Sequence, residues 1–200
     1  LASADSAGRE ALAMWRALHK GPHSGTAQAL TALGCIKLDA SQHEAAEPLI
    51  REGLAMSQTL HPNGDRSVAV GLNSLGNLMH YVGKFDAADS LQRLALAMHR
   101  RMGGELNPDV QADLLNLSMV ETDRGRFAAA ESLARMGLAV GDRIYTEPHP
   151  VQASGLITLA GVYLRTGQLA RADSLAHQSL EIAKHVRGGG EGAVGEALAT

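Results

Sequence analysis

Hydrophobic residues recur at steps of three and four along most of this chain, which is the spacing of one face of an α-helix. In residues 69–83, "AVGLNSLGNLMHYVG", the leucines Leu72, Leu75 and Leu78 form such a stripe. A second stripe of the same kind lies within residues 88–96. The pattern therefore predicts two helices in succession, with a short turn between them.

The two predicted helices recur along the chain with a period of 42 residues. The segment "GKFDAADSLQRLAL" at 83–96 is preceded by "SQHEAAEPLIREGL" at 41–54, and it is followed by "GRFAAAESLARMGL" at 125–138 and "GQLARADSLAHQSL" at 167–180. The connections "HPNGDRS", "NPDV" and "EPHPV" separate the copies, because proline stops one helix and permits the next to start. A fixed period of this length predicts a helical repeat array.

Small residues occupy three equivalent positions in each copy. The turn begins with Ser41, Gly83, Gly125 or Gly167, where a left-handed conformation can end the first helix. The other two positions, one on each helix, hold Gly34, Gly76, Ser118 and Ala160, and Ala46, Ala88, Ala130 and Ala172. We expect the two helices of a pair to approach closely there.

The period also sets the expected domain organisation, a single array over residues 1–200. Residues 4–14, "ADSAGREALAM", align with residues 88–98, so the chain is expected to begin inside the second helix of a unit. The expected segments are a partial repeat at 1–20, repeats at about 24–61, 66–104, 108–146 and 150–187, and a partial repeat at 191–200.

The two ends are expected to differ from the middle, because we interpret the chain as a fragment of a longer array. Leu12, Trp15 and Leu198 should be less well covered than their inner equivalents. The glycines at 188–190 are expected to form a flexible connection.

Composition narrows the class of partner. The chain has 200 residues and a formal net charge of −3, which favours neither a nucleic acid nor a membrane surface as partner. No apolar run approaches about 18 residues, and no signal-peptide pattern opens the chain. The single cysteine, Cys35, excludes an internal disulfide and suits a reducing compartment, so we expect a cytoplasmic protein.

Motifs that carry chemistry are missing from the sequence. We find no phosphate-binding loop, metalloprotease helix, nucleophile elbow or kinase catalytic loop. The histidines include no pair at metal-ligand spacing with a supporting carboxylate, and Cys35 has no matching histidine in its unit. We therefore expect no enzyme activity, no catalytic residue, no metal site and no cofactor.

Charged residues also follow the period. Glu47, Asp89 and Glu131 each precede an arginine by four residues, and these arginines are Arg51, Arg93 and Arg135. Acid-to-base pairs at this spacing stabilise a helix by a few tenths of a kcal/mol. We assign both sets to stability.

The stretch "LNSLGNLMHYVGKFDAADSLQRLAL" resembles the tetratricopeptide repeat in its order of leucine, small residue, turn glycine, aromatic residue, alanine and final leucine. The period and the lead-in from Pro108 to Leu114 are similar to the longer, kinesin-light-chain-like variety. The resemblance covers practically the whole chain. It implies an all-α fold, a right-handed α-solenoid of stacked antiparallel helix pairs that coil into a superhelix.

The resemblance further implies a non-catalytic protein–protein interaction scaffold, which binds a peptide or partner protein in a concave groove lined by the first helices. The candidate peptide-binding residues lie on these helices: Thr31, Asn73, Asn77, His80, Leu115, Asn116, Met119, Ile157 and Thr158. The amides of Asn73 and Asn77 could bond an extended peptide, and we expect alanine there to weaken binding while barely changing stability. Leu115, Met119 and Ile157 suit aliphatic side chains. Cut repeat ends could also self-associate.

Two other interpretations remain open. The sequence motifs "ADSL" and "AESL" are similar to those in arrays attached to bacterial serine/threonine kinases. This array could therefore be the sensing or docking segment of a larger signalling protein. It could also be the regulatory arm of a transcriptional regulator. Kinase motifs, a helix-turn-helix or further repeats before Leu1 would each support a different one of these interpretations.

Overall fold

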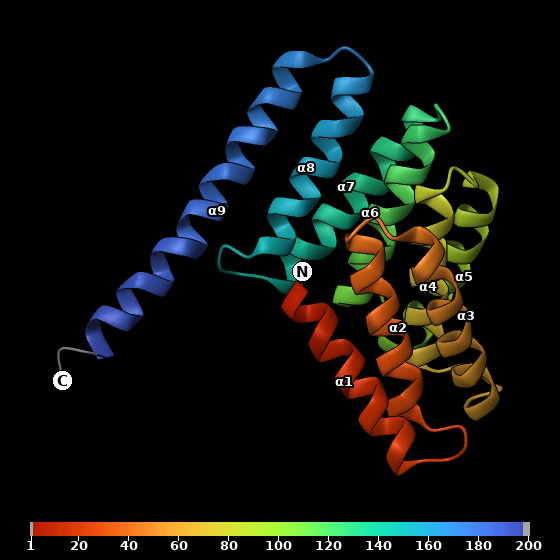
Figure 1. Ribbon diagram of the computed structural model, residues 1–200. Coiled ribbons are helices and arrows are strands. Elements are labelled where there is room, and N and C mark those ends of the chain that lie inside the picture. Colours follow the sequence, from red (N-terminus) through yellow and green to blue (C-terminus); the bar gives the residue numbers. More distant parts are fainter. Residues whose placement is uncertain (1, 198–200) are drawn as a thin grey trace. The chain divides into compact units, whose positions relative to one another are not determined.

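The structure, a computed structural model, describes the backbone of residues 2–197 and the side chains of residues 2–186. In this part of the chain the regular secondary structure is entirely α-helical (Figure 1). The helices are α1 (Ala2–Leu18), α2 (Ser24–Asp39), α3 (His43–Leu60), α4 (Arg66–Tyr81), α5 (Phe85–Gly103), α6 (Pro108–Asp123), α7 (Phe127–Ile144), α8 (Pro150–Arg165) and α9 (Leu169–Ala197). The expectation of an all-α helical repeat protein is confirmed.

The helices group into two compact units, unit 1 (Leu1–Gly104) and unit 2 (Glu105–Thr200). In unit 1 the helices α2 and α3 form one hairpin and α4 and α5 another, with α1 against α2 and α3 against α4. In unit 2 the hairpins are α6 with α7 and α8 with α9, and α7 packs against α8. The first helices of neighbouring repeats also touch within each unit, α2 with α4 and α6 with α8.

The four turns inside the hairpins share one conformation. Gly83, Gly125 and Gly167 have φ angles of 75°, 75° and 74°, and Ser41 takes the same left-handed region at 57°. In the second hairpin the Lys84 N–H donates to the Met79 carbonyl at 2.8 Å, and the other three turns repeat this bond. This pairing, in which a left-handed residue closes the last turn of a helix, explains why the glycine recurs with the period.

The small residues lie where the helices of a hairpin touch. A Cβ atom added at Gly34 would come within 2.5 Å of the Ile50 side chain, and one at Gly76 within 2.7 Å of Gln92. At the equivalent place in α6, the Ser118 hydroxyl donates to the Ala130 carbonyl at 2.8 Å. Larger side chains would therefore push the paired helices apart and leave the core between them poorly packed.

Each connection between repeats ends in a residue whose side chain caps the next helix. Asp65 caps α4 and Asn107 caps α6 through a side-chain oxygen, which accepts a backbone N–H bond of 3.0 Å and 2.9 Å respectively. His23 caps α2 and His149 caps α8 in the same register, through the ring atom Nδ1. The caps satisfy N–H groups that have no partner inside the helix.

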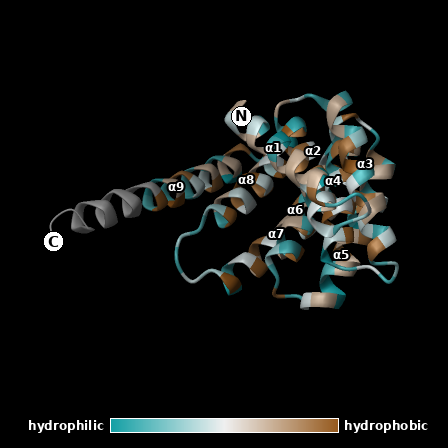
Figure 2. Ribbon diagram, turned by 60° about the horizontal axis from the view of Figure 1, so that its bottom comes forward, coloured by the Kyte–Doolittle hydropathy of each residue, from teal (hydrophilic) through white to brown (hydrophobic). Residues whose placement is uncertain are grey.

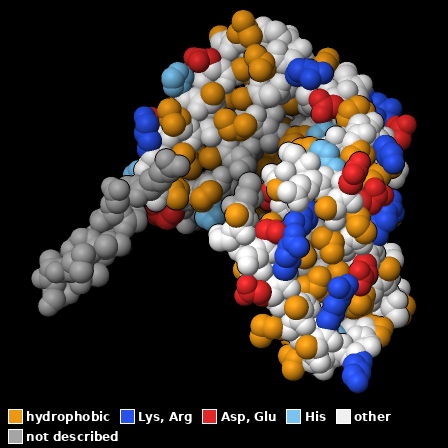
Figure 3. Space-filling view, in the orientation of Figure 1, with side chains coloured by type: hydrophobic (Ala, Val, Ile, Leu, Met, Phe, Trp, Pro, Cys, Tyr) orange, Lys and Arg blue, Asp and Glu red, His pale blue; other side chains and the backbone are white. Residues whose placement is uncertain are grey.

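The surface carries charges of both signs, and the buried residues are mainly apolar, with some polar side chains such as Gln92 and Glu121 among them. Figure 3 shows Lys and Arg side chains interspersed with Asp and Glu on the visible face. The structure contains the ion pairs expected at four-residue spacing, namely Glu47–Arg51, Asp89–Arg93 and Glu131–Arg135. Hydrophobic and hydrophilic residues alternate along the helices (Figure 2). Among the described residues, none of the helices combines the length and the apolar character that crossing a membrane needs.

The ends of the chain differ from two of the sequence expectations. Helix α9 continues through residues 188–190 to Ala197, so the connection expected there is absent; glycine costs about 1 kcal/mol in a helix, which does not forbid it. Leu12 was expected to be poorly covered, which is wrong, since it is only 6% exposed and packs against Leu30 and Leu33 of α2. Trp15 is half-buried, as expected, whereas Leu198 lies outside the described residues.

Candidate functional site

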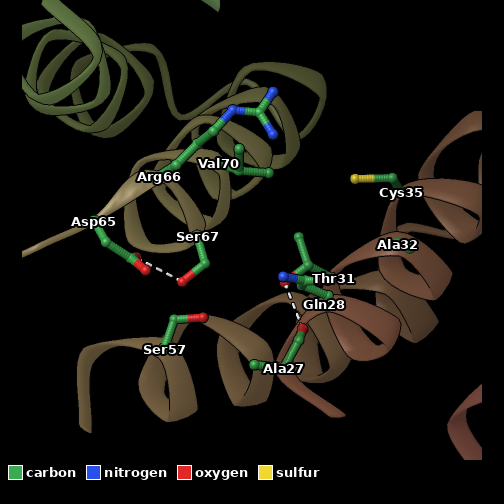
Figure 4. A pocket seen from close by; sticks show the side chains of 10 residues that line it. All are labelled: Ala27, Gln28, Thr31, Ala32, Cys35, Ser57, Asp65, Arg66, Ser67 and Val70. Carbon is green, nitrogen blue, oxygen red and sulfur yellow. Dashed lines mark hydrogen bonds between the residues drawn. The ribbon is translucent and has the colours of Figure 1, made fainter. Parts of the chain in front are cut away.

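A pocket of about 430 Å³ lies between the first helices of the two complete repeats in unit 1. Figure 4 shows Thr31 and Cys35 of α2 on one side and Ser67 and Val70 of α4 on the other. The lining residues are Ala27, Gln28, Thr31, Ala32, Cys35, Ser57, Asp65, Arg66, Ser67 and Val70. The pocket thus includes Thr31, one of the residues for which the family resemblance implies peptide binding.

Small side chains on α2 leave this space open. Thr31, Ala32 and Cys35 lie one period before Asn73, Ser74 and Asn77, and two periods before Leu115, Asn116 and Met119. The residues at these positions in α6 are larger than those in α2. Local side-chain size therefore favours an open space beside α2.

Asp65 fixes the polar end of the pocket. Its Oδ1 atom accepts hydrogen bonds from the Ser67 hydroxyl at 2.6 Å and from the Val68 N–H at 3.0 Å. Burial raises the pKa of the Asp65 carboxyl, but these bonds and the nearby His61 outweigh it, so that the net pKa lies below its ordinary value. The carboxylate is therefore ionised at neutral pH and is committed to capping α4.

Cys35 is poorly suited to covalent chemistry. Burial raises the pKa of its thiol, and the charge of Asp39 adds to this, which together exceed the opposing effect of the Ser74 bond. The thiol donates to the Ser74 hydroxyl at 3.3 Å, and that hydroxyl donates in turn to the Val70 carbonyl. A thiol with a raised pKa has a smaller thiolate fraction at neutral pH, so Cys35 is not activated as a nucleophile and contributes surface to the pocket.

Two of the expected binding residues are mostly buried. Thr31 is 7% exposed, and its hydroxyl donates to the Ala27 carbonyl at 3.1 Å. Leu115 is 6% exposed, because its side chain fills the space beside Gly137 of α7. The expectation that Leu115 lies open to a ligand is wrong, and Thr31 contributes only a small edge to the pocket.

Asn73 and Asn77 form an internal hydrogen-bond network. The Asn77 amide donates from Nδ2 to Asn73 Oδ1 at 3.2 Å, and Asn77 Oδ1 accepts a bond of 2.8 Å from Gln92 Nε2 of α5. Gln92 is fully buried, whereas both asparagines are half-buried. The Asn77 amide, which was expected to bond a peptide, therefore holds α4 to α5, and this changes what its replacement is expected to do.

The remaining candidates lie on the surface of their own units. His80 is half-buried on α4, with its ring near those of Tyr81 and Phe85. On α6, Met119 is 38% exposed, and on α8, Ile157 is 52% exposed. Asn116 and Thr158 are half-buried, and Thr158 donates its hydroxyl to the Ser154 carbonyl at 3.0 Å.

Sequence reasoning found Thr31 but missed most of the pocket. Gln28, Ala32, Arg66, Ser67 and Val70 were not expected to form a site. A comparison of side-chain size at equivalent repeat positions could have indicated α2, because three off-stripe positions there hold small residues. Among the residues whose side chains are described, no three histidine, cysteine or carboxylate groups gather as metal ligands would.

Comparisons with known proteins agree with this repeat architecture. Two family models, both described as tetratricopeptide repeat, match residues 68–108 and 110–185. No curated protein sequence matches the chain.

Solved structures give a similar result. A kinesin light chain of P. anserina with nearly identical TPR-like repeats matches with a TM-score of 0.63 and 17% identity, over 91% of this chain and 86% of that one. A variant of that protein matches with a TM-score of 0.66 and 19% identity, over 92% and 87%. BtubC (BKLC) from P. vanneervenii matches with a TM-score of 0.58 and 18% identity, over 93% and 92%. At these identities the likeness shows a shared fold.

Proposed function

Since the chain belongs to the tetratricopeptide repeat family, whose members generally mediate protein–protein interactions, we propose that it is a non-catalytic binding module. Its ligand is an extended segment of a partner protein, and the primary site is the pocket between α2 and α4. Exposed residues of unit 2, above all Met119 and Ile157, form a second contact surface.

The observation that carries this proposal is the pocket itself. Its volume of about 430 Å³ falls within the range of about 300–1,000 Å³ that is usual for ligand sites. Ala32 and Val70 offer apolar contact for a side chain, while Gln28 and Ser67 offer groups that can bond a peptide backbone. This mixture suits an extended peptide, which presents side chains and unpaired backbone groups together.

The experiment tests the pocket by placing a larger side chain in it and measuring peptide affinity. Peptides selected from a displayed random library on the whole chain are labelled with fluorescein, and their affinity is measured by fluorescence polarisation. Ala32→Leu places a larger side chain in the pocket, and we expect it to weaken binding by about tenfold or more, roughly the loss of one good contact. Ala32 is exposed, so the melting temperature should change little.

A matched control distinguishes the pocket from the rest of the surface. Ala45→Leu makes the same change at an exposed position of α3 that does not line the pocket. It should leave the affinity unchanged. Equal binding by wild type and Ala32→Leu would remove the pocket from the proposal, and failure to select any peptide would count against peptide binding as a whole.

A further inference from the structure

Two of the four helix caps between repeats are histidines, and the geometry points to an acid-sensitive device at those two places. We propose that protonation of His23 and His149 releases the first turns of α2 and α8. Resting on the proposed function, we further propose that this release weakens peptide binding in unit 1, because Ala27 and Gln28 near the start of α2 belong to one wall of the pocket.

The cap of α2 requires a neutral imidazole. The ring atom Nδ1 of His23 accepts a hydrogen bond of 3.1 Å from the Gly25 N–H. A doubly protonated imidazole has N–H groups at both ring positions and can only donate. Histidine is also the side chain whose ordinary titration falls between about pH 5 and 8, which is why it commonly serves as a pH-sensitive group in proteins.

The rings around His23 make a second positive charge costly. The imidazole of His23 stacks on that of His19 with ring centroids 3.7 Å apart and an interplanar angle of 4°, and it lies 5.0 Å from the Trp15 ring. Trp15 also touches the first turn of α2, since a Cβ atom at Gly25 would come within 2.6 Å of its ring. Protonation of both histidines would therefore place two like charges in contact.

The charged groups near this cap do not compensate for a cation. Arg16 of α1 is bound to Glu52 of α3 at 2.8 Å, and Lys20 adds a positive charge to the connection. The first turn of α2 contains no acidic residue. A positive charge at a helix N-terminus opposes the helix dipole, so the protonated cap lacks both its hydrogen bond and electrostatic support.

His149 repeats the arrangement at the start of α8. Its Nδ1 atom accepts a bond of 3.3 Å from the Val151 N–H, and its ring stacks on Tyr145 with centroids 3.9 Å apart at 5°. The first turn of α8 also contains no acidic residue. The charged groups nearby are Asp142, which accepts a bond from the Gln152 side chain, Arg143 in the last turn of α7, and Glu147 in the connection.

The other two caps provide controls within the same chain. Asn107 cannot titrate, and its helix α6 has Asp109 in the first turn. Asp65 has a lowered pKa and stays ionised in mild acid. Between about pH 7.5 and about pH 5.5, protonation of the capping side chain should therefore loosen the starts of α2 and α8 and spare those of α4 and α6.

The experiment measures hydrogen exchange of the unliganded whole chain by NMR at about pH 7.5 and about pH 5.5, corrected for the intrinsic effect of pH on exchange. The informative amides are Gly25 and Ala27 of α2 and Val151 of α8, with Asp109 and Gln111 of α6 for comparison. Loss of a cap should lower protection in α2 and α8 by roughly two- to thirtyfold. Protection in α6 should stay constant.

His23→Asn is the decisive variant, because asparagine keeps an acceptor that does not titrate and already occupies this register at Asn107. It should abolish the acid response of α2 and leave that of α8 unchanged. Constant protection of α2 in the wild type, an equal response in His23→Asn, or a loss that extends to α6 would each overturn the proposal.

The effect on binding is measured with the selected fluorescein-labelled peptide. Its dissociation constant should rise between about pH 7.5 and about pH 5.5 in the wild type and stay nearly constant in His23→Asn. An equal rise in both would overturn the link to the pocket. Because the exchange experiment needs no ligand, it tests the acid response of the two histidine caps even if no peptide binds.

Discussion

At the scale of single residues, half-buried amides connect the two helices of a repeat. Asn77 lies between Asn73 and the fully buried Gln92, and it bonds both. A buried amide that loses its partner retains the full free-energy cost of its removal from water. Replacing both partners by apolar groups can leave the stability nearly unchanged. Asn77 is thus a structural residue first, and a contribution to binding would come only from its accessible part.

Replacing Asn77 with alanine should lower the free energy of unfolding by about 1–2 kcal/mol, because Gln92 Nε2 would lose its acceptor. Urea unfolding followed by circular dichroism measures this change. The double variant Asn77→Leu/Gln92→Met serves as the control and should recover most of the loss. An Asn77→Ala protein as stable as the wild type would restore the original expectation that the amide is free to serve a ligand.

At the scale of helices, Tyr163 connects α7 to α8. Its hydroxyl donates to Glu131 Oε1 at 2.8 Å and accepts a bond of 2.6 Å from Arg135, and Arg171 lies over its ring. The bond from Tyr163, followed by that from Arg135, holds the pKa of Glu131 below its ordinary value. The charge pair expected within α7 therefore belongs to a contact between two helices.

Tyr163→Phe should destabilise the chain by about 1 kcal/mol at neutral pH, since the ring stays but its hydroxyl bonds are lost. A carboxyl with a lowered pKa contributes stability above its unfolded pKa, near 4.5, and loses it as the pH falls through the folded value. The difference from the wild type should therefore shrink toward about pH 3. Urea unfolding across this pH range tests both points.

Tyr81→Phe is the matched control for this prediction. Tyr81 is 57% exposed, so loss of its hydroxyl should change stability little at any pH. A Tyr163→Phe penalty that is constant with pH would show that Glu131 does not take part in the contact.

At the scale of the whole molecule, helices inside a unit such as α3 and α8 contact other helices on both sides, whereas in the described part of the chain α1 contacts only α2 and α9 only α8. On α1, Met14 is 65% and Leu18 is 70% exposed, although Leu12 is buried against α2. On α9, Leu169 is 63% and Leu180 is 49% exposed. Stability in a repeat array is close to a sum of unit and interface contributions, so helices with fewer interfaces open more easily.

Hydrogen exchange should therefore be fastest in α1 and in the described part of α9, and slower in helices that contact neighbours on both sides, such as α3. Mass spectrometry of peptic fragments gives this profile without assignments. Met14→Glu should leave exchange in α3 unchanged, because the side chain is already exposed. Uniform protection along the chain would contradict this prediction. The right-handed superhelix implied by the family resemblance also stays a prediction.

The sequence by itself determined the helices, their pairing and their turns, because these depend on residues close together in the chain. The leucine spacing, the turn glycine at Gly83 and the proline connections all act locally, and each repeats with the period. The same local rules predicted the acid–base pairs, such as Glu131 with Arg135, which the structure contains.

Only the tertiary structure decided which first-helix side chains are exposed. Leu115 and Met119 belong to the same helix and were expected to behave alike, yet Leu115 is buried against α7 and Met119 is exposed. The pocket and the Asn77–Gln92 bond likewise require side chains from two helices. Burial depends on what a neighbouring helix places opposite each residue, and the pattern along one helix does not contain that information.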